Sequence, residues 1–288
     1  MESKSLSKAI LKTLSYADIF DYPLTEKEIW QYLVEEKTTQ SQVSKSLKSL
    51  LNKGKVFKFF FFFLPGREKI AKKREKRAKL AFKKLKRAKL AARVLAIIPS
   101  VRLVGLTGAL AMSNSKKEDD IDFLVVTSRD FLWTTRFLAT TLLTILGLKR
   151  GRTAKKVAGK ICLNMFIDET NLAFEDRNLF IAHEISQLKP LFERRETYRE
   201  FLSYNKWVQE FLPNYPLLKT TIKPKLPPKP IFLAVVLEKL LKKAQLAYMY
   251  SHITTEKISD KILKFHPQDI SFEVLSKYEK KVKSLKTS

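Results

Sequence analysis

The chain has 288 residues, 45% of them hydrophobic, so it can bury a sizeable core and is not a disordered tail. Lys and Arg number 56 against 29 Asp and Glu, which gives a net charge of +27. A charge of this size attracts polyanions such as nucleic acid, nucleotides and anionic membranes, although a lysine-rich surface without such a partner is the alternative.

Cys162 is the only cysteine, which excludes an intrachain disulfide and suits a reducing compartment. The N-terminal residues have no long apolar core and no small-residue cleavage site, so we expect no signal peptide and a cytoplasmic protein. The apolar stretch from Phe131 to Leu148 contains Arg136 and several threonines, which favours a buried helix and no stable membrane insertion.

Residues 1–65 are predicted to form a small helical unit that ends in a hairpin. Apolar residues recur at helical spacing in three segments, and Thr25 with Glu28 forms a capping box before the second. We expect the third helix to open at Ser41 and to end at Asn52 and Gly54, before the phenylalanine-rich run that follows. Three helices and a short β element are typical of a winged helix-turn-helix domain.

Such a unit binds DNA through its third helix or mediates only protein contacts. Lys45 and Lys48 lie on the predicted third helix, with Lys53 and Lys55 just after it. The helix carries no arginine, and both interpretations stay open.

Residues 66–98 are predicted to form a basic connector helix. From Arg67 to Arg93 there are fourteen Lys or Arg and two Glu. A charge run of this kind is either a solvated face or a surface that contacts a phosphate backbone, so nucleic acid is an expected partner of this helix or of the winged helix.

Residues 99–215 alternate strands and helices, which indicates an α/β (α+β) domain with a sheet covered by helices. The strands are expected in 101–108, 120–127 and 160–167, and later helices at about 178–192 and 198–212. Residues 216–288 are predicted to be a C-terminal helical segment that begins with the proline-rich connector 223–230.

The residues that suggest chemistry lie between Val101 and Thr127. A strand ends at Gly108, where the backbone can turn tightly, and a short helix is expected from Ala109, with free amides that favour an anion. Asp120 and Asp122 then stand two residues apart in a strand, so they project from one face. Adjacent carboxylates repel each other unless a cation lies between them, and carboxylate oxygens suit Mg²⁺.

This stretch resembles the signature of the DNA polymerase β-like nucleotidyltransferase superfamily. The signature is an apolar strand, Gly-Ser or Gly-Gly, a loop of variable sequence and an acidic pair on the next strand, and here Gly108–Ala109 and Asp120–Asp122 take those places. The resemblance implies a nucleotidyltransferase-type mixed sheet. It also implies Mg²⁺ held by Asp120 and Asp122, and a nucleoside triphosphate bound at Gly108, Ala109 and the following amides.

Two residues depart from the family pattern. Ala109 replaces the usual serine, and Asn164 occupies the strand position where the family often has a third carboxylate; an asparagine can coordinate Mg²⁺ but cannot act as a base. Asp168, at the end of that strand, is the candidate substitute.

We therefore expect Mg²⁺-dependent transfer of a nucleotide from a nucleoside triphosphate to an acceptor that the sequence does not identify. The alternative is a non-catalytic nucleic-acid-binding or regulatory protein built on a degenerate domain. His183 and Glu184 match half of a zinc motif, but no second histidine follows at the required spacing, so zinc is not expected. Lys149, Arg150 and Arg152 form a basic turn that is either solvated or in contact with phosphate.

Overall fold

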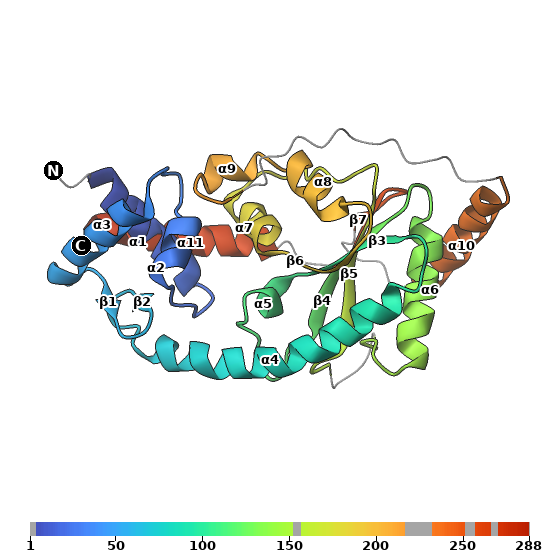
Figure 1. The fold of residues 1–288 in the computed structure, drawn as a ribbon, viewed down its shortest axis with the longest axis horizontal. Coiled ribbons are helices and arrows are strands. Elements are labelled where there is room, and N and C mark those ends of the chain that lie inside the picture. The colour runs from blue at the N-terminus through green and yellow to red at the C-terminus, as the bar shows by residue number, and fades with distance from the viewer. Residues whose placement is uncertain (1–3, 152–156, 217–231, 251–256, 266–269, 288) are drawn as a thin grey trace.

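The computed structural model describes residues 4–151, 157–216, 232–250, 257–265 and 270–287. It confirms a mixed α/β fold, with a six-stranded sheet, a small two-stranded sheet and helices around them (Figure 1). We call the first part, through β2, the N-terminal unit; its elements are α1 (Lys4–Asp18), α2 (Glu26–Gln31), α3 (Gln40–Asn52), β1 (Phe57–Lys58) and β2 (Phe62–Phe63).

Local capping explains the helix boundaries of the N-terminal unit. The predicted capping box at α2 is present, with Glu28 N donating to the Thr25 side chain. A second capping box, formed by Thr39 and Gln42, opens α3 at Gln40 rather than at the predicted Ser41. The element order is the one predicted, and the assignment of a winged helix stays a prediction.

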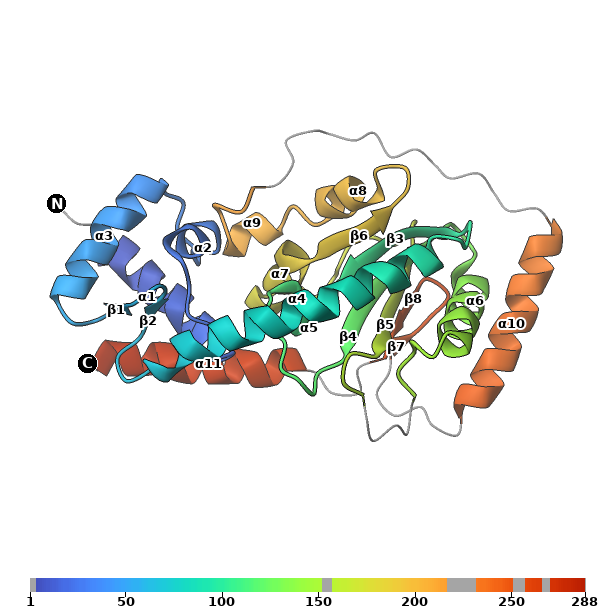
Figure 2. The same ribbon diagram turned by 60° about the horizontal axis from the view of Figure 1, so that its bottom comes forward.

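The basic connector is a continuous helix, α4 (Lys69–Leu95), which extends from the N-terminal unit to the large sheet (Figures 1 and 2). It buries a stripe of small residues, including Ala81, Ala88, Ala91 and Ala92, against the domain. Most of its lysines lie on the opposite, exposed face.

The large sheet has the strand order β6-β3-β4-β5-β8-β7. Only β4 and β5 are parallel, and each other neighbouring pair is antiparallel. Its strands are β3 (Val101–Leu106), β4 (Ile121–Thr127), β5 (Ile161–Asp168), β6 (Lys189–Glu193), β7 (Lys257–Ile258) and β8 (Ile262–Lys264).

Two hydrophobic cores lie on opposite faces of this sheet, because alternate residues of each strand point to opposite sides. On one face, Phe123 and Val125 pack with residues of α4 and of α6 (Leu132–Ile145). On the other, Leu124 and Val126 pack with residues of the later helices and of the N-terminal unit. The remaining helices are α5 (Gly108–Ala111), α7 (Leu179–Gln187), α8 (Thr197–Tyr204), α9 (Val208–Phe211), α10 (Phe232–Tyr250) and α11 (Ile270–Thr287).

The expected apolar helix is α6, whose Trp133 and Leu143 are buried. Within the described residues, no helix combines the length and the apolar character that crossing a membrane requires.

The structure differs from the sequence prediction at two places. The helix expected over residues 178–192 ends at Gln187, and β6 follows, because Pro190 cannot continue a helix and instead pairs with Gly105 at an edge strand. The C-terminal segment is not all helical, since β7 and β8 add to the large sheet; these strands are too short to give a sequence period. The proline-rich connector 223–230 lies outside the described residues.

The N-terminal unit is docked on the rest of the chain by polar contacts. The Asn214 side chain donates to the Trp30 carbonyl and accepts from the Thr38 amide, both at 3.0 Å. Asn114 donates to the Phe20 carbonyl at 2.9 Å, and Lys281 of α11 pairs with the buried Asp18. These contacts join segments that are distant in the chain, and the domain limits at 65, 98 and 215 stay a prediction.

Arg194 fixes the end of α4 against the sheet, and its removal should destabilise the protein. Its guanidinium donates to the carbonyls of Ala96, Ile98 and Val101 at 2.7–3.0 Å. We expect Arg194→Ala to lower the free energy of unfolding in urea by about 2–3 kcal/mol, since charged donors to partly buried carbonyls are lost. The exposed Arg93→Ala, on α4, is the control and should stay within about 0.5 kcal/mol of the wild type.

Candidate functional site

The turn after β3 brings the backbone next to the acidic pair. β3 and β4 are antiparallel, with Leu106 opposite Phe123, and the Thr107 amide donates to the Asp122 carbonyl at 3.0 Å. Gly108 follows with a φ of +63°, and a Cβ at this position would lie 3.0 Å from Asp122 Oδ2. The backbone of Gly108 and Ala109 therefore approaches the Asp122 carboxylate more closely than a side chain would permit.

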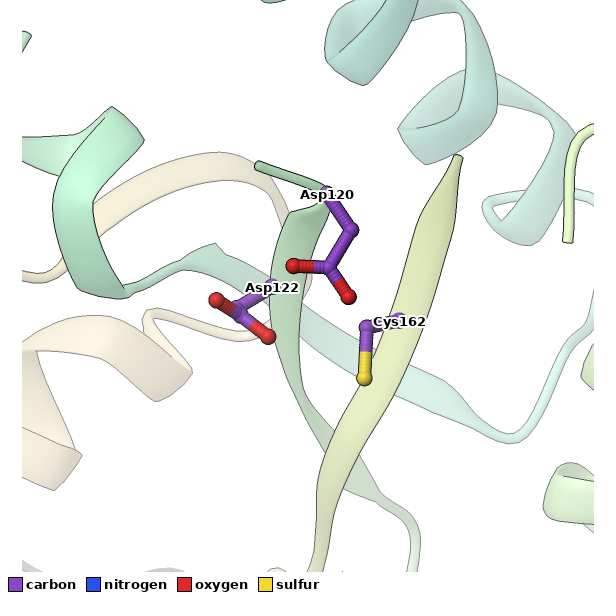
Figure 3. Close-up of side chains that lie close together, drawn as sticks. All are labelled: Asp120, Asp122 and Cys162. Carbon is purple, nitrogen blue, oxygen red and sulfur yellow. The ribbon is translucent and has the colours of Figure 1, made fainter. Parts of the chain in front are cut away.

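The two carboxylates lie together, with a thiol beside them (Figure 3). Asp120 lies immediately before β4 and Asp122 within it, while Cys162 faces Asp122 from the parallel strand β5. One ligand atom from each of the three lies within 4.8 Å of the others. This group of acidic residues could hold a metal ion.

The electrostatic environment of the two carboxylates is unequal. Burial, then the charges of Asp120 and Glu184, raise the pKa of the Asp122 carboxyl to about 7. Its Oδ1 is buried and has no hydrogen-bond partner. Asp120 instead accepts a hydrogen bond from Arg150 at 2.6 Å, so only one carboxylate of the pair has a cationic partner. An additional cation would stabilise the charged form of Asp122.

The thiol of Cys162 keeps its proton when no metal is bound. Burial, followed by the charges of Asp122 and Asp120, raises its pKa to about 12, so the sulfur keeps its proton near neutral pH. In that state the thiol donates to Asp122. The carboxylate oxygens of Asp120 and Asp122 are donors that suit a hard divalent cation.

Asn164 lies near the pair, and Asp168 does not. The β4–β5 register shifts by one residue at Asn164, between the pairs Phe123–Leu163 and Leu124–Met165, and its Oδ1 is buried without a partner. Asp168 lies six residues beyond Cys162 on the same strand, which is about 20 Å away. There it accepts hydrogen bonds from the Asp130 and Thr170 amides, so the suggestion that it substitutes for a third carboxylate is wrong.

A carboxylate that the sequence analysis does not place at the site comes from α7. Glu184 lines a cavity of about 390 Å³ together with Gly108, Asp122 and Asn164. Burial raises the pKa of Glu184 to about 7, against the opposing charge of Lys264. The His-Glu pair at 183–184 is visible in the sequence, but it gives no sign that this helix faces β4.

The N-terminal unit forms the opposite wall of this cavity. Tyr16 of α1 stacks on His183, with ring centroids 4.1 Å apart, and Tyr32 lies 5.5 Å from the same ring. Burial lowers the pKa of His183 to about 3, so its ring is neutral near neutral pH. The helical unit therefore contributes directly to the surroundings of the acidic pair.

One lysine of α4 supports the loop that carries the acidic run. Lys84 donates to the Ser115 hydroxyl at 2.9 Å and to the Asp119 carbonyl at 2.6 Å. The Asp119 carboxylate accepts from the Lys116 amide at 2.7 Å, so it stabilises the loop rather than joining the pair. In the basic turn, Arg150 contacts Asp120, and Arg152 lies outside the described residues.

No protein family model matches the chain, and no curated protein matches it. A solved structure of a toxin–antitoxin with AMP-PNP is similar, at 17% sequence identity and a TM-score of 0.27. The similarity covers 43% of this chain and 89% of that one. A TM-score this low supports no conclusion about fold or function, so the site rests on its own geometry.

Replacing Asp122 should stabilise the protein above neutral pH. The pKa of the Asp122 carboxyl is raised from its ordinary 3.8 to about 7 in the folded chain. At a pH between these two values the folded chain therefore retains a proton that the unfolded chain has lost. Stability therefore falls as pH rises through this window. We expect Asp122→Asn to raise the free energy of unfolding at pH 8 by about 1–2 kcal/mol, with a smaller gain at pH 5.

Urea unfolding at both pH values measures this difference. The control is Asp130→Asn, at an exposed carboxylate with a φ of +58° that asparagine also tolerates. An Asp122→Asn protein that is less stable than the wild type at pH 8 would contradict the buried, unpaired state of this carboxylate.

Proposed function

We propose that the protein is a Mg²⁺-dependent nucleotidyltransferase, which transfers a nucleotide from a nucleoside triphosphate to an acceptor. In this proposal Asp120 and Asp122 hold the metal and are the catalytic residues. The backbone of Gly108 and Ala109 contacts the triphosphate, and the Asn164 amide oxygen is a further polar contact at the site.

One observation carries the proposal, namely the convergence of two carboxylates beside a glycine turn with a positive φ. The Asp122 Oδ1 atom is buried without a partner, and the pKa of its carboxyl is raised to about 7. An orphaned buried acceptor between carboxylates fits a hard divalent cation. Gly108 lies beside Asp122, and because it has no Cβ its backbone comes close to that carboxylate.

The reaction is a phosphoryl substitution with simple atom balance. The acceptor oxygen forms a bond to the α-phosphorus, the bond from that phosphorus to the bridging oxygen breaks, pyrophosphate leaves, and the acceptor proton passes to water. Mg²⁺ bound at this position supplies charge stabilisation for the phosphates. The chain positions the triphosphate through Gly108 and Ala109, and Arg150 is close enough to Asp120 to offer its charge to a phosphate.

A second candidate function is a non-catalytic nucleic-acid-binding or regulatory role. It is favoured by the exposed face of α4, which carries Lys72, Lys76, Lys79, Lys83 and Lys86 at helical spacing, and by an asparagine in place of a third carboxylate on β5. Incubation of the protein with labelled nucleoside triphosphates, Mg²⁺ and an RNA pool distinguishes the two candidate functions. Salt-sensitive RNA binding without transfer of label favours the regulator.

Loss of either metal-binding carboxylate should abolish turnover. We expect Asp120→Asn and Asp122→Asn to lower the Mg²⁺-dependent release of pyrophosphate from labelled triphosphates by at least about 100-fold, because charge stabilisation of the reacting phosphate is lost. Circular dichroism should show an intact fold, and Asp130→Asn should retain wild-type turnover. If both substitutions at the pair leave turnover unchanged, the assignment fails.

A side chain at Gly108 should weaken triphosphate binding. Gly108→Ala places a Cβ 3.0 Å from Asp122 Oδ2 and forces alanine into a left-handed conformation, which costs about 1–2 kcal/mol. Gly147→Ala is the matched control, since Gly147 has a φ of +62° and nothing within 4 Å of an added Cβ. Calorimetry should show weaker binding of Mg²⁺–ATP by Gly108→Ala alone. Equal effects of the two substitutions would mean that strain, not proximity to the site, is responsible.

A further inference from the structure

The cavity beside Asp122 has an apolar lining with few charges. It is bounded by the N-terminal unit, the strands β4 and β5, α7 and the start of α11. Aromatic and aliphatic side chains supply most of its surface, among them Tyr16, Phe20, Tyr32, Leu124, Met165 and Phe180. A volume of about 390 Å³ is in the range of sites that enclose small organic molecules.

Three buried polar atoms of the lining residues have no hydrogen-bond partner. They are Asp122 Oδ1, Asn164 Oδ1 and His183 Nε2. The Gln187 amide nitrogen lies 3.0 Å from His183 Nδ1, so the neutral imidazole accepts there and presents its proton at Nε2. The side chain of His183 is 5% exposed. The proposed metal site already uses Asp122 Oδ1, which leaves one donor, His183 Nε2, and one acceptor, Asn164 Oδ1. Because orphaned polar atoms are costly to bury, these two indicate a ligand that both accepts and donates hydrogen bonds.

The charges around the apolar part of the cavity do not favour an anionic occupant there. Among the described residues that line it, Lys264 is the only cationic side chain, against the carboxyl groups of Asp122 and Glu184. Arg150 lies on the Asp120 side of the pair and is not part of the lining. Gly108 and Ala109 also line the cavity, beside Asp122. A triphosphate at Gly108 would therefore occupy that edge of the cavity, and an uncharged molecule fits the apolar part lined by Tyr16, Phe20 and Phe180.

We propose that this cavity is the acceptor subsite of the proposed transferase, and that the acceptor is a small, uncharged alcohol with an apolar or aromatic ring. The ring lies between the aromatic side chains of the N-terminal unit and β4, and the hydroxyl group meets the polar atoms near Asp122. The inference rests on the proposed function and adds the class of acceptor. The apolar lining and the carboxyl groups of Asp122 and Glu184 do not suit a polyanion such as nucleic acid.

Fractionation of one cell extract tests the proposal. The extract is separated into RNA, protein and small molecules, and the small molecules are passed through an anion-exchange resin. Each fraction is incubated with the full-length protein, Mg²⁺ and triphosphates labelled at the α-phosphate. We expect label to appear only in products from the small molecules that the resin does not retain.

Label in RNA, in protein or in the retained anions would overturn the acceptor assignment while leaving nucleotidyl transfer intact. Binding of Mg²⁺–ATP that depends on Asp120, without labelling of any fraction, would also overturn the acceptor assignment. Absence of both Mg²⁺–ATP binding and labelling would overturn the proposed function as well.

The variant His183→Phe separates a ligand contact from a structural role. Phenylalanine preserves the stacking on Tyr16 and removes both the orphaned Nε2 atom and the Nδ1 acceptor of the half-buried Gln187. Because these two effects on stability oppose each other, we expect a thermal midpoint close to that of the wild type, unchanged Mg²⁺–ATP binding and at least a tenfold loss of transfer to the small molecules. The control is Ser186→Ala on the same helix, whose hydroxyl already donates to the His183 carbonyl at 3.0 Å. It should lower the midpoint and retain transfer. Full transfer by His183→Phe would contradict the assignment.

Discussion

Two carboxylates that the fold forces together are the constraint on which the candidate site depends. The pairing of β3 with β4 brings Asp122 against the turn at Gly108. Because Asp120 stands two residues before Asp122, it projects from the same face. Arg150 pairs only with Asp120, so Asp122 retains a buried oxygen without a partner. A protein tolerates such an unfavourable arrangement at a site where a ligand compensates for it, which is why stability and function often oppose each other at binding sites.

Local signals in the sequence are sufficient for much of the fold. The Thr25 capping box, the basic helix and the alternation around Asp120 and Asp122 are all properties of short segments. The strand β6 escapes sequence-based prediction because the helical spacing of apolar residues continues through Pro190. The strands β7 and β8 have two and three residues, so only their partners in the sheet define them.

The surroundings of the acidic pair cannot be predicted in the same way. The stacking of Tyr16 on His183 joins segments that are far apart in the chain, and no local pattern indicates such a contact. In the sequence Glu184 stands out only as part of half a zinc motif, whereas the structure places it on the cavity beside Asp122. Asp168 follows Asn164 closely in the chain, which suggests a place near the site, yet the parallel register carries it to the far end of the sheet.

The walls of the cavity also restrict the order in which the protein can fold. Thr13 and Ser271 line the same space, although nearly the whole described chain lies between them. Contacts between such distant residues form late, because the entropy of closing the intervening loop must be overcome first. The sheet around β3, β4 and β5 can assemble from neighbouring segments, but the cavity exists only after α1 and α11 have docked.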